Sequence, residues 1–140
     1  MSSPLIVYRT GNDLDLNEVI ALYEASTLGK RRPMQDRARM QAMLQHANLV
    51  ITAWADAQLV GISRALSDFA FVTYLSDLAV HRDFQKQGIG KELIRQTQLV
   101  GGPHAKVILL AAPAAEQYYP HIGFSHHPQA WMLSGDALVK

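Results

Sequence analysis

Residues 85–90 read Gln-Lys-Gln-Gly-Ile-Gly, and an apolar helix pattern begins within them. Residues without a β-carbon allow a backbone to come close to a phosphate group. The N–H groups at the start of a helix can then converge on the anion, where the helix dipole adds positive potential. The hexapeptide predicts a phosphate-binding loop, although a glycine-rich turn that only starts a helix fits these six residues equally well.

The glycine spacing separates three kinds of phosphate loop. A nucleoside-triphosphate loop requires Ser or Thr after Gly-Lys, whereas Glu92 follows Gly90 and Lys91. The dinucleotide fingerprint needs a small residue where Leu93 stands, and it belongs to the first strand–helix turn of a domain. The third pattern, Gln/Arg-x-x-Gly-x-Gly/Ala, fits in full over residues 85–90 and suits a pyrophosphate.

Hydrophobic periodicity predicts the elements that position this loop. Strand-like runs occupy residues 5–9, 48–55, 58–66, 71–80, 106–112 and 129–133, and helical patterns occupy 15–26, 40–47, 89–100 and 114–119. This order predicts a mixed α/β fold in which an antiparallel meander leads into a strand–loop–helix–strand unit. Because no linker or repeat interrupts the chain, we expect one domain over residues 1–140.

Local signals bound several of these elements. Asp15, with Glu18 three residues later, predicts a capping box at the start of the first helix. Gly29 is a candidate stop for that helix, and residues 101–103, Gly-Gly-Pro, end the helix that follows the loop. The methionines at 40 and 43 lie at helical spacing, which favours core packing.

The composition narrows the class of protein. The 140 residues are 49% apolar and 18% charged, with a net charge of +1 and a pI near 8.1, so nothing indicates nucleic acid as a partner. No apolar run is long enough for a membrane span, and the first residues lack the pattern of a signal peptide. We therefore expect a soluble cytoplasmic protein. The absence of cysteine excludes a cysteine nucleophile, a thiolate metal site and a disulfide. The histidines do not form a metal-binding pattern.

Residues 76–94, SDLAVHRDFQKQGIGKELI, resemble the cofactor-binding signature of the GCN5-related N-acetyltransferases, the GNAT family. A second block, YYPHIGF at residues 118–124, stands where that family often carries an aromatic pair followed by Gly-Phe. The resemblance implies the GNAT fold, a mostly antiparallel mixed sheet splayed into a V and flanked by about four helices. It also implies transfer of an acetyl group from acetyl-CoA to a small amine or a lysine side chain, without a metal.

The resemblance assigns the coenzyme-binding residues. The backbone of Leu78, Ala79 and Val80 would pair with the pantetheine arm near a bulge, and an N–H there, that of Ala79 or a neighbour, would polarise the thioester carbonyl. Without the adjacent loop, these three residues would simply be core strand. The pyrophosphate would be bound at the loop residues Gln85, Lys86, Gln87, Gly88, Ile89, Gly90 and Lys91.

Tyr119 matches the family's tyrosine that protonates the departing CoA thiolate, in a direct attack by the amine within a ternary complex. Pro120 departs from the family pattern and constrains that tyrosine. The family's glutamate base is replaced by Tyr74. Asp77, Asp68 or a water relay remain as candidates for the base, and strand alternation puts Tyr74 and Asp77 on opposite faces unless a bulge intervenes.

The sequence leaves open the class of function, the acceptor and the oligomeric state. A non-catalytic acyl-CoA sensor on the same fold, or a nucleotide-binding protein, would also carry the glycine loop. Lys30, Arg31 and Arg32 could attract an acidic acceptor, although a solvated charge run explains them as well. Relatives of the family often pair through their C-terminal strands, so a homodimer is a further option.

Overall fold

A computed structural model describes residues 4–140, which divide into two compact units, one ending at Leu110 and the other Ala111–Lys140. The first unit contains β1 (Ile6–Thr10), α1 (Leu16–Glu24), the 3₁₀ turn η1 (Thr27–Arg31), α2 (Arg37–Gln45), β2 (Leu49–Ala55), β3 (Gln58–Ser67), β4 (Val72–Val80), η2 (Arg82–Phe84), α3 (Ile89–Gly101) and β5 (Lys106–Ile108). The second contains η3 (Pro113–Ala115) and α4 (Tyr118–His121). The predicted mixed α/β plan is confirmed, while a single domain over 1–140 stays a prediction.

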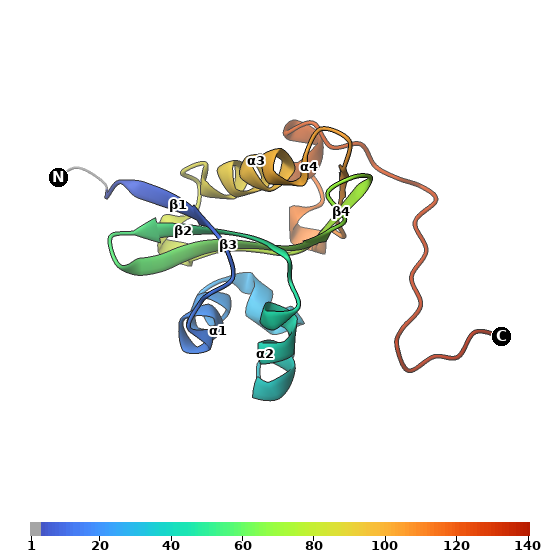
Figure 1. Ribbon diagram of the computed structural model, residues 1–140, viewed down its shortest axis with the longest axis horizontal. Helices are drawn as coiled ribbons and strands as arrows, with labels where there is room; N and C mark the ends of the chain where they lie inside the picture. Colours follow the sequence, from blue (N-terminus) through green and yellow to red (C-terminus); the bar gives the residue numbers. More distant parts are fainter. Residues whose placement is uncertain (1–3) are drawn as a thin grey trace. The chain divides into compact units, whose positions relative to one another are not determined.

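The five strands form one sheet in sequential order from β1 to β5. Neighbouring strands are antiparallel, except that β4 and β5 run parallel. The parallel pair covers only residues 72–74 of β4, which continues to Val80 without this partner. Helix α3 covers one face of the sheet, and α1 and α2 lie on the other (Figure 1).

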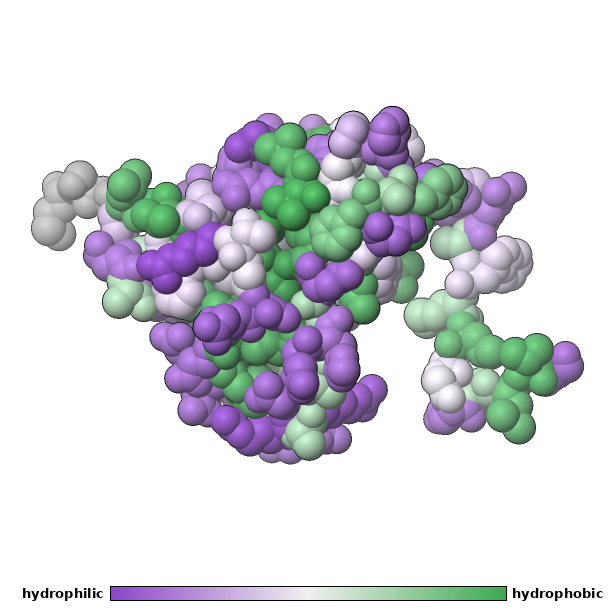
Figure 2. Space-filling model, viewed as in Figure 1, coloured by the Kyte–Doolittle hydropathy of each residue, from purple (hydrophilic) through white to green (hydrophobic). Residues whose placement is uncertain are grey.

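Each face of the sheet has its own apolar core. Leu22 of α1 and Met40 of α2 pack with Ile62 and Ala79 on one face, as the methionine spacing predicted. On the other face, Leu93 of α3 packs with residues of β2 and β3. The outer surfaces of α1 and α2 carry mainly hydrophilic side chains (Figure 2), so these helices are amphipathic elements of a two-sided sheet.

A bulge at Ser76 changes the direction of side chains along β4. Arg64 of β3 pairs with Asp77, but the next residue, Ala65, pairs with Leu75, so Ser76 is the extra residue. Before the bulge, Leu75 shares the α3 face with its partner Ala65. After it, Asp77 points to the opposite face, where it contacts α1. In a regular strand, Leu75 and Asp77 would share a face, because side chains alternate with a period of two. The bulge at Ser76 puts them on opposite faces instead.

Several sequence-based boundaries were wrong in detail. Residues 129–133 form no strand, and Trp131 is 94% exposed. An apolar run becomes a strand only where a neighbouring strand bonds its backbone, which periodicity does not reveal. Strand β5 ends at Ile108, and the predicted helix 114–119 is split between η3 and α4.

The first helix also differs from its predicted boundaries. It ends at Glu24, so Gly29 does not stop it and lies instead in η1. Asp15 does cap the helix, but its carboxylate accepts from the N–H of Asn17 rather than that of Glu18. The bulge at Ser76 lies two residues before Leu78, near residues 78–80 as the family resemblance implied.

Candidate functional site

The glycine loop is anchored where β4 ends. The His81 N–H donates to the carbonyl of Val60 at 2.8 Å, and the Arg82 N–H donates to the carbonyl of Ala25 just after α1 at 3.0 Å. The Gln85 side-chain amide donates to the Val80 carbonyl at 3.0 Å. These bonds tie the start of the loop to β3, α1 and β4, so the first predicted loop residue has a structural role as well.

The loop reaches α3 through two residues in the left-handed region. Lys86 has φ of 64°, which is uncommon outside glycine, and Gly88 has φ of 82°. Gly88 is also the N-cap of α3 and provides no side-chain cap. The first N–H groups of the helix have no partner within the helix itself. The turn therefore leaves an uncapped helix start, beside the exposed side chains of Lys86 and Lys91, which is the geometry that binds anions in other proteins.

The two glycines differ in what the protein itself requires of them. A β-carbon at Gly88 would meet open space, but its positive φ disfavours any other residue. At Gly90, a β-carbon would lie 3.8 Å from Val80 Cγ2 and 3.9 Å from Leu78 Cδ2, which are ordinary contacts. Neither packing nor conformation demands glycine at position 90, where it weakens the helix. The fit of a bound group against that backbone would explain it.

Residues 78–80 of β4 lie beside this loop. Leu78 and Val80 are half-buried on the α3 face and flank Gly90, whereas Ala79 is buried in the core against α1 and α2. These residues pair with β3 along one edge. Among residues 4–110, no strand pairs with their other edge, because β5 reaches only residue 74. The backbone groups of that edge are available to an extended, amide-containing ligand.

Asp77 is fully buried and lies in a polar cluster between the sheet and α1. It accepts hydrogen bonds from Tyr23 Oη at 2.7 Å, Arg32 Nε at 2.7 Å and Arg64 Nε at 2.6 Å. The hydroxyl of Ser76 also donates to it at 3.2 Å. Burial alone would raise the pKa of Asp77, but Arg64, Tyr23 and Arg32 together hold the pKa below its usual value. A carboxylate so stabilised as the anion takes up a proton poorly.

The other carboxylate candidate, Asp68, closes the turn between β3 and β4. One of its oxygens accepts from the N–H groups of Phe71, Val72 and Ala70. These backbone hydrogen bonds lower the pKa of Asp68 to about 2. It acts as the cap of a hairpin turn, and its low pKa makes it a weak base.

The second unit contains the YYPHIGF block. The ring of Tyr119 lies against Tyr118 and Phe124, with centroids 5.4 and 5.5 Å away, and the Phe124 N–H donates to the Tyr119 carbonyl. Pro120 lies in the first turn of the four-residue α4, where its missing N–H has no helical partner to lose. Burial and then the neighbouring Tyr118 raise the pKa of Tyr119, so its phenol holds its proton at neutral pH. His121 is exposed at the end of α4.

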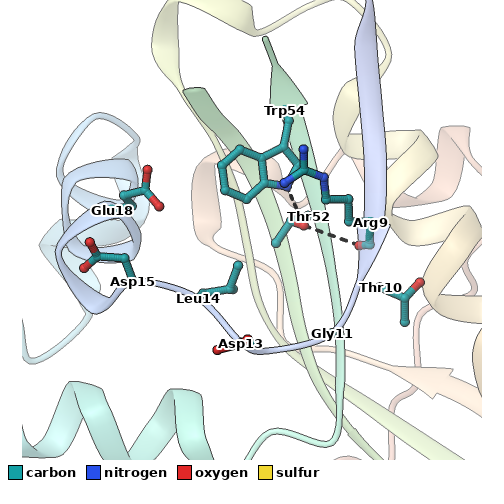
Figure 3. Close-up of a pocket in the computed structure, with 9 residues that line it drawn as sticks. All are labelled: Arg9, Thr10, Gly11, Asp13, Leu14, Asp15, Glu18, Thr52 and Trp54. Carbon is teal, nitrogen blue, oxygen red and sulfur yellow. Dashed lines mark hydrogen bonds between the residues drawn. The ribbon is translucent and has the colours of Figure 1, made fainter. Parts of the chain in front are cut away.

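Two shallow hollows lie elsewhere in the first unit. One of about 190 Å³ is lined by residues of β1, β2 and the start of α1, and none of its lining residues belongs to β4 or the glycine loop. In this hollow the Arg9 guanidinium lies 4.6 Å from the centre of the Trp54 ring, and Thr52 bonds both residues (Figure 3). The other, of about 180 Å³, is lined by residues of α1 and β3 and by His81. Neither hollow coincides with the uncapped helix start.

Sequence reasoning overlooked the partners of Asp77. Arg64 stands inside an otherwise apolar strand run, and Asp77 stands inside the next one. Because a buried charge needs an opposite charge beside it, these two residues in consecutive strands could have been paired from the sequence. Tyr23 looked like an apolar helix position, and nothing local distinguishes it.

Within residues 4–140, no helix is long and apolar enough to cross a membrane. The same part of the chain holds no group of three or more histidine or acidic side chains arranged for a metal ion.

Comparison with known proteins decides the family. A family model described as an acetyltransferase (GNAT) domain matches residues 22–132. The chain belongs to the GNAT acetyltransferase family. This membership makes the chain an acetyltransferase domain, and it confirms the family and the fold class that the sequence predicted.

Individual GNAT relatives agree with this. An N-acetyltransferase of Pyropia yezoensis, ycf52, is 31% identical over 82% of this chain and 71% of its own length. GCN5-related N-acetyltransferase 1, chloroplastic, of Arabidopsis thaliana is 26% identical over 91% of this chain and 64% of its own. The match covers between 40% and 71% of the length of three ycf52 relatives.

A solved structure shares the GNAT fold. The aminoglycoside N-acetyltransferase AAC(6')-Iy in complex with CoA superimposes with a TM-score of 0.74, covering 97% of this chain and 98% of that one. The two sequences are only 18% identical, so the similarity concerns the fold alone.

Proposed function

We propose that this chain transfers the acetyl group of acetyl-CoA to a primary amine, on either a small molecule or a lysine side chain. The observation that carries the proposal is the position of Gly90 at the uncapped start of α3, where an added β-carbon would contact Leu78 and Val80. The helix start proposed for the pyrophosphate and the strand edge proposed for the pantetheine arm thus adjoin each other. The aminoglycoside acetyltransferase with this fold is a complex with CoA, which supports the same class of donor here.

The predicted coenzyme-binding residues divide by role. The N–H groups of residues 87–90 hold the pyrophosphate, and Lys86 and Lys91 add charge from the exposed rim. Gln85 supports the loop through its bond to the Val80 carbonyl. The backbone of residues 78–80 pairs with the amides of the pantetheine arm, and an N–H near Ala79 polarises the thioester carbonyl.

In the chemical step the neutral amine attacks the thioester carbonyl, and the carbon–sulfur bond breaks. Tyr119, whose phenol is protonated at neutral pH, gives its proton to the departing CoA thiolate. The burial and ion pairs of Asp77, and the low pKa of Asp68, favour a water relay for removal of the amine proton. No acyl-cysteine intermediate can form, because the chain has no cysteine.

The test combines binding and turnover. Titration with acetyl-CoA, followed by free-thiol release over a panel of small amines and lysine peptides, should give tight binding and amine-dependent thiol. Binding with no thiol release on any amine would support the acyl-CoA sensor instead. If ATP or NAD competes more strongly than CoA, the protein is a nucleotide-binding protein. A homodimer and a cytoplasmic location remain predictions, to be checked by light scattering and by imaging.

A further inference from the structure

Arg32, which directly follows η1 in the connection between α1 and α2, reaches across to β4. Its Nε donates to Asp77 Oδ1 at 2.7 Å, and its Nη2 donates to the carbonyl of Ser76 at 2.8 Å. The third bond, from Nη1 to the Arg31 carbonyl, fixes the side chain to its own segment. The Arg32 side chain is only 21% exposed. One guanidinium therefore ties the connection between two helices to the bulge in β4.

The bulge needs these bonds. The extra residue of a bulge falls out of the strand ladder, and its buried polar groups require other partners. The Ser76 carbonyl receives Arg32, and the Ser76 hydroxyl receives Arg64 Nη2 at 2.9 Å while donating to Asp77. Arg64 also bonds Asp77 directly, so the carboxylate keeps one arginine if the other is lost. Among the side chains of residues 4–140, only that of Arg32 donates a hydrogen bond to the Ser76 carbonyl.

The bulge decides what the second half of β4 presents. With Ser76 as the extra residue, Leu78 and Val80 point towards α3 and Ala79 towards α1 and α2. Loss of the bulge would shift residues 77–80 by one position relative to β3 and exchange these faces. It would also exchange which backbone N–H and C=O groups point to the edge that no strand of residues 4–110 covers, because these groups alternate along a strand.

We propose that Arg32 is a positioning residue for acetyl-CoA: by holding the bulge at Ser76, it determines which backbone groups of residues 78–80 meet the pantetheine arm. The proposal rests on the proposed binding of acetyl-CoA along β4. It assigns Arg32 no contact with the reacting atoms. The proposal also makes a well-ordered connection between α1 and α2 a condition for coenzyme binding, because the guanidinium of Arg32 holds that connection as well as the bulge.

The experiment compares two ligands that share the pyrophosphate. CoA carries the pantetheine arm, whereas 3′-phospho-ADP has the same nucleotide without it. Calorimetric titration of Arg32→Ala should show CoA affinity lowered about tenfold. The reason is that the bulge loses the hydrogen bond from Arg32 to the Ser76 carbonyl, and a bond from a charged donor is worth about this factor. The affinity for 3′-phospho-ADP should stay within about twofold, because the glycine loop is untouched.

Two further variants complete the design. Arg32→Lys keeps the charge but lacks the fork that bonds Ser76 and Asp77 together, so it should restore CoA affinity only in part. Arg37→Ala removes an exposed arginine from the start of α2 and should bind both ligands as wild type does. Hydrogen exchange at residues 76–80 should be faster in Arg32→Ala than in Arg37→Ala.

Each remaining outcome is decisive. Equal CoA affinity in Arg32→Ala and Arg37→Ala would overturn the proposal and leave the proposed function standing. Equal weakening of CoA and 3′-phospho-ADP would also overturn it, since that pattern indicates a general loss of structure. Failure of the wild-type protein to bind either ligand would refute the proposed function and this proposal with it. If Arg32→Ala does not fold, the comparison of Arg32→Lys with wild type applies the same criteria.

Discussion

Arg64 of β3 and Asp77 of β4 face each other across adjacent strands, and their side chains form an ion pair of 2.6 Å inside the core. The Asp77 carboxylate is completely shielded from solvent, and Tyr23 and Arg32 share it. Such a cluster is costly to break, because removing one member leaves a buried charge without compensation.

We therefore expect Asp77→Asn to lower the free energy of unfolding by about 3–5 kcal/mol, because the buried Arg64 and the half-buried Arg32 lose their counter-charge. Urea denaturation followed by far-UV circular dichroism measures this. The control is Asp56→Asn, in the turn between β2 and β3, where a φ of 53° suits asparagine. A loss no greater than that of the control would show that Asp77 is not part of a stabilising cluster.

Acid should lower the free energy of unfolding of the wild-type protein, because the Asp77 carboxylate becomes protonated. Because the pKa of Asp77 is lower in the folded state than in the unfolded state, folding favours its ionised form. That stability is present above the unfolded pKa of about 3.9 and is lost as pH falls through the folded pKa. Urea midpoints measured between pH 7 and pH 3 should fall more steeply for wild type than for Asp77→Asn. Parallel curves for the two proteins would contradict the lowered pKa.

The two loop glycines should respond differently to alanine. Gly88→Ala places a β-carbon at φ of 82° and should cost about 1–2 kcal/mol of stability. Gly90→Ala should leave the unliganded protein equally stable, or more stable by up to about 1 kcal/mol, because alanine favours the helix and its β-carbon fits beside Val80. Thermal melts without ligand distinguish these outcomes. Comparable losses in both variants would show that position 90 is constrained by the protein and not by a ligand.

Tyr119→Phe removes the proposed acid and keeps the ring that packs on Tyr118 and Phe124. The turnover rate with the best amine found should fall by about a hundredfold, the order expected for losing a general acid, with acetyl-CoA affinity little changed. Tyr118→Phe is the matched control and should retain turnover within about twofold. Unchanged turnover of Tyr119→Phe at every pH would remove Tyr119 from the chemistry.

Local patterns predicted the parts of the fold that local forces decide. The start of α3 at the second half of the glycine loop, and its end before Gly102, followed from residue types with known backbone preferences. The bulge at Ser76 has no such signal, because it depends on arginines from β3 and from the connection before α2. As a consequence, Tyr74 and Asp77 were expected on opposite faces of β4. The pairing of Tyr74 with Leu66, next to Ala65, puts it on the face of Asp77.

The end of the chain shows the same limit. The apolar residues around Trp131 fit a strand pattern, but whether such a segment pairs is decided by a neighbour that its own sequence does not specify. The glycine spacing was enough to predict a phosphate-binding loop, whereas the cluster around Asp77 required the partners of each buried charge to be found across the fold.

The edge of β4 beyond residue 74 has a consequence for how the protein behaves in a cell. A strand with free N–H and C=O groups is a template on which other chains can add and aggregate. A donor molecule bound along residues 78–80 would occupy that template, so the substrate would also act as a solubility factor. Protein kept with CoA should then remain monodisperse at concentrations and temperatures where the ligand-free protein precipitates.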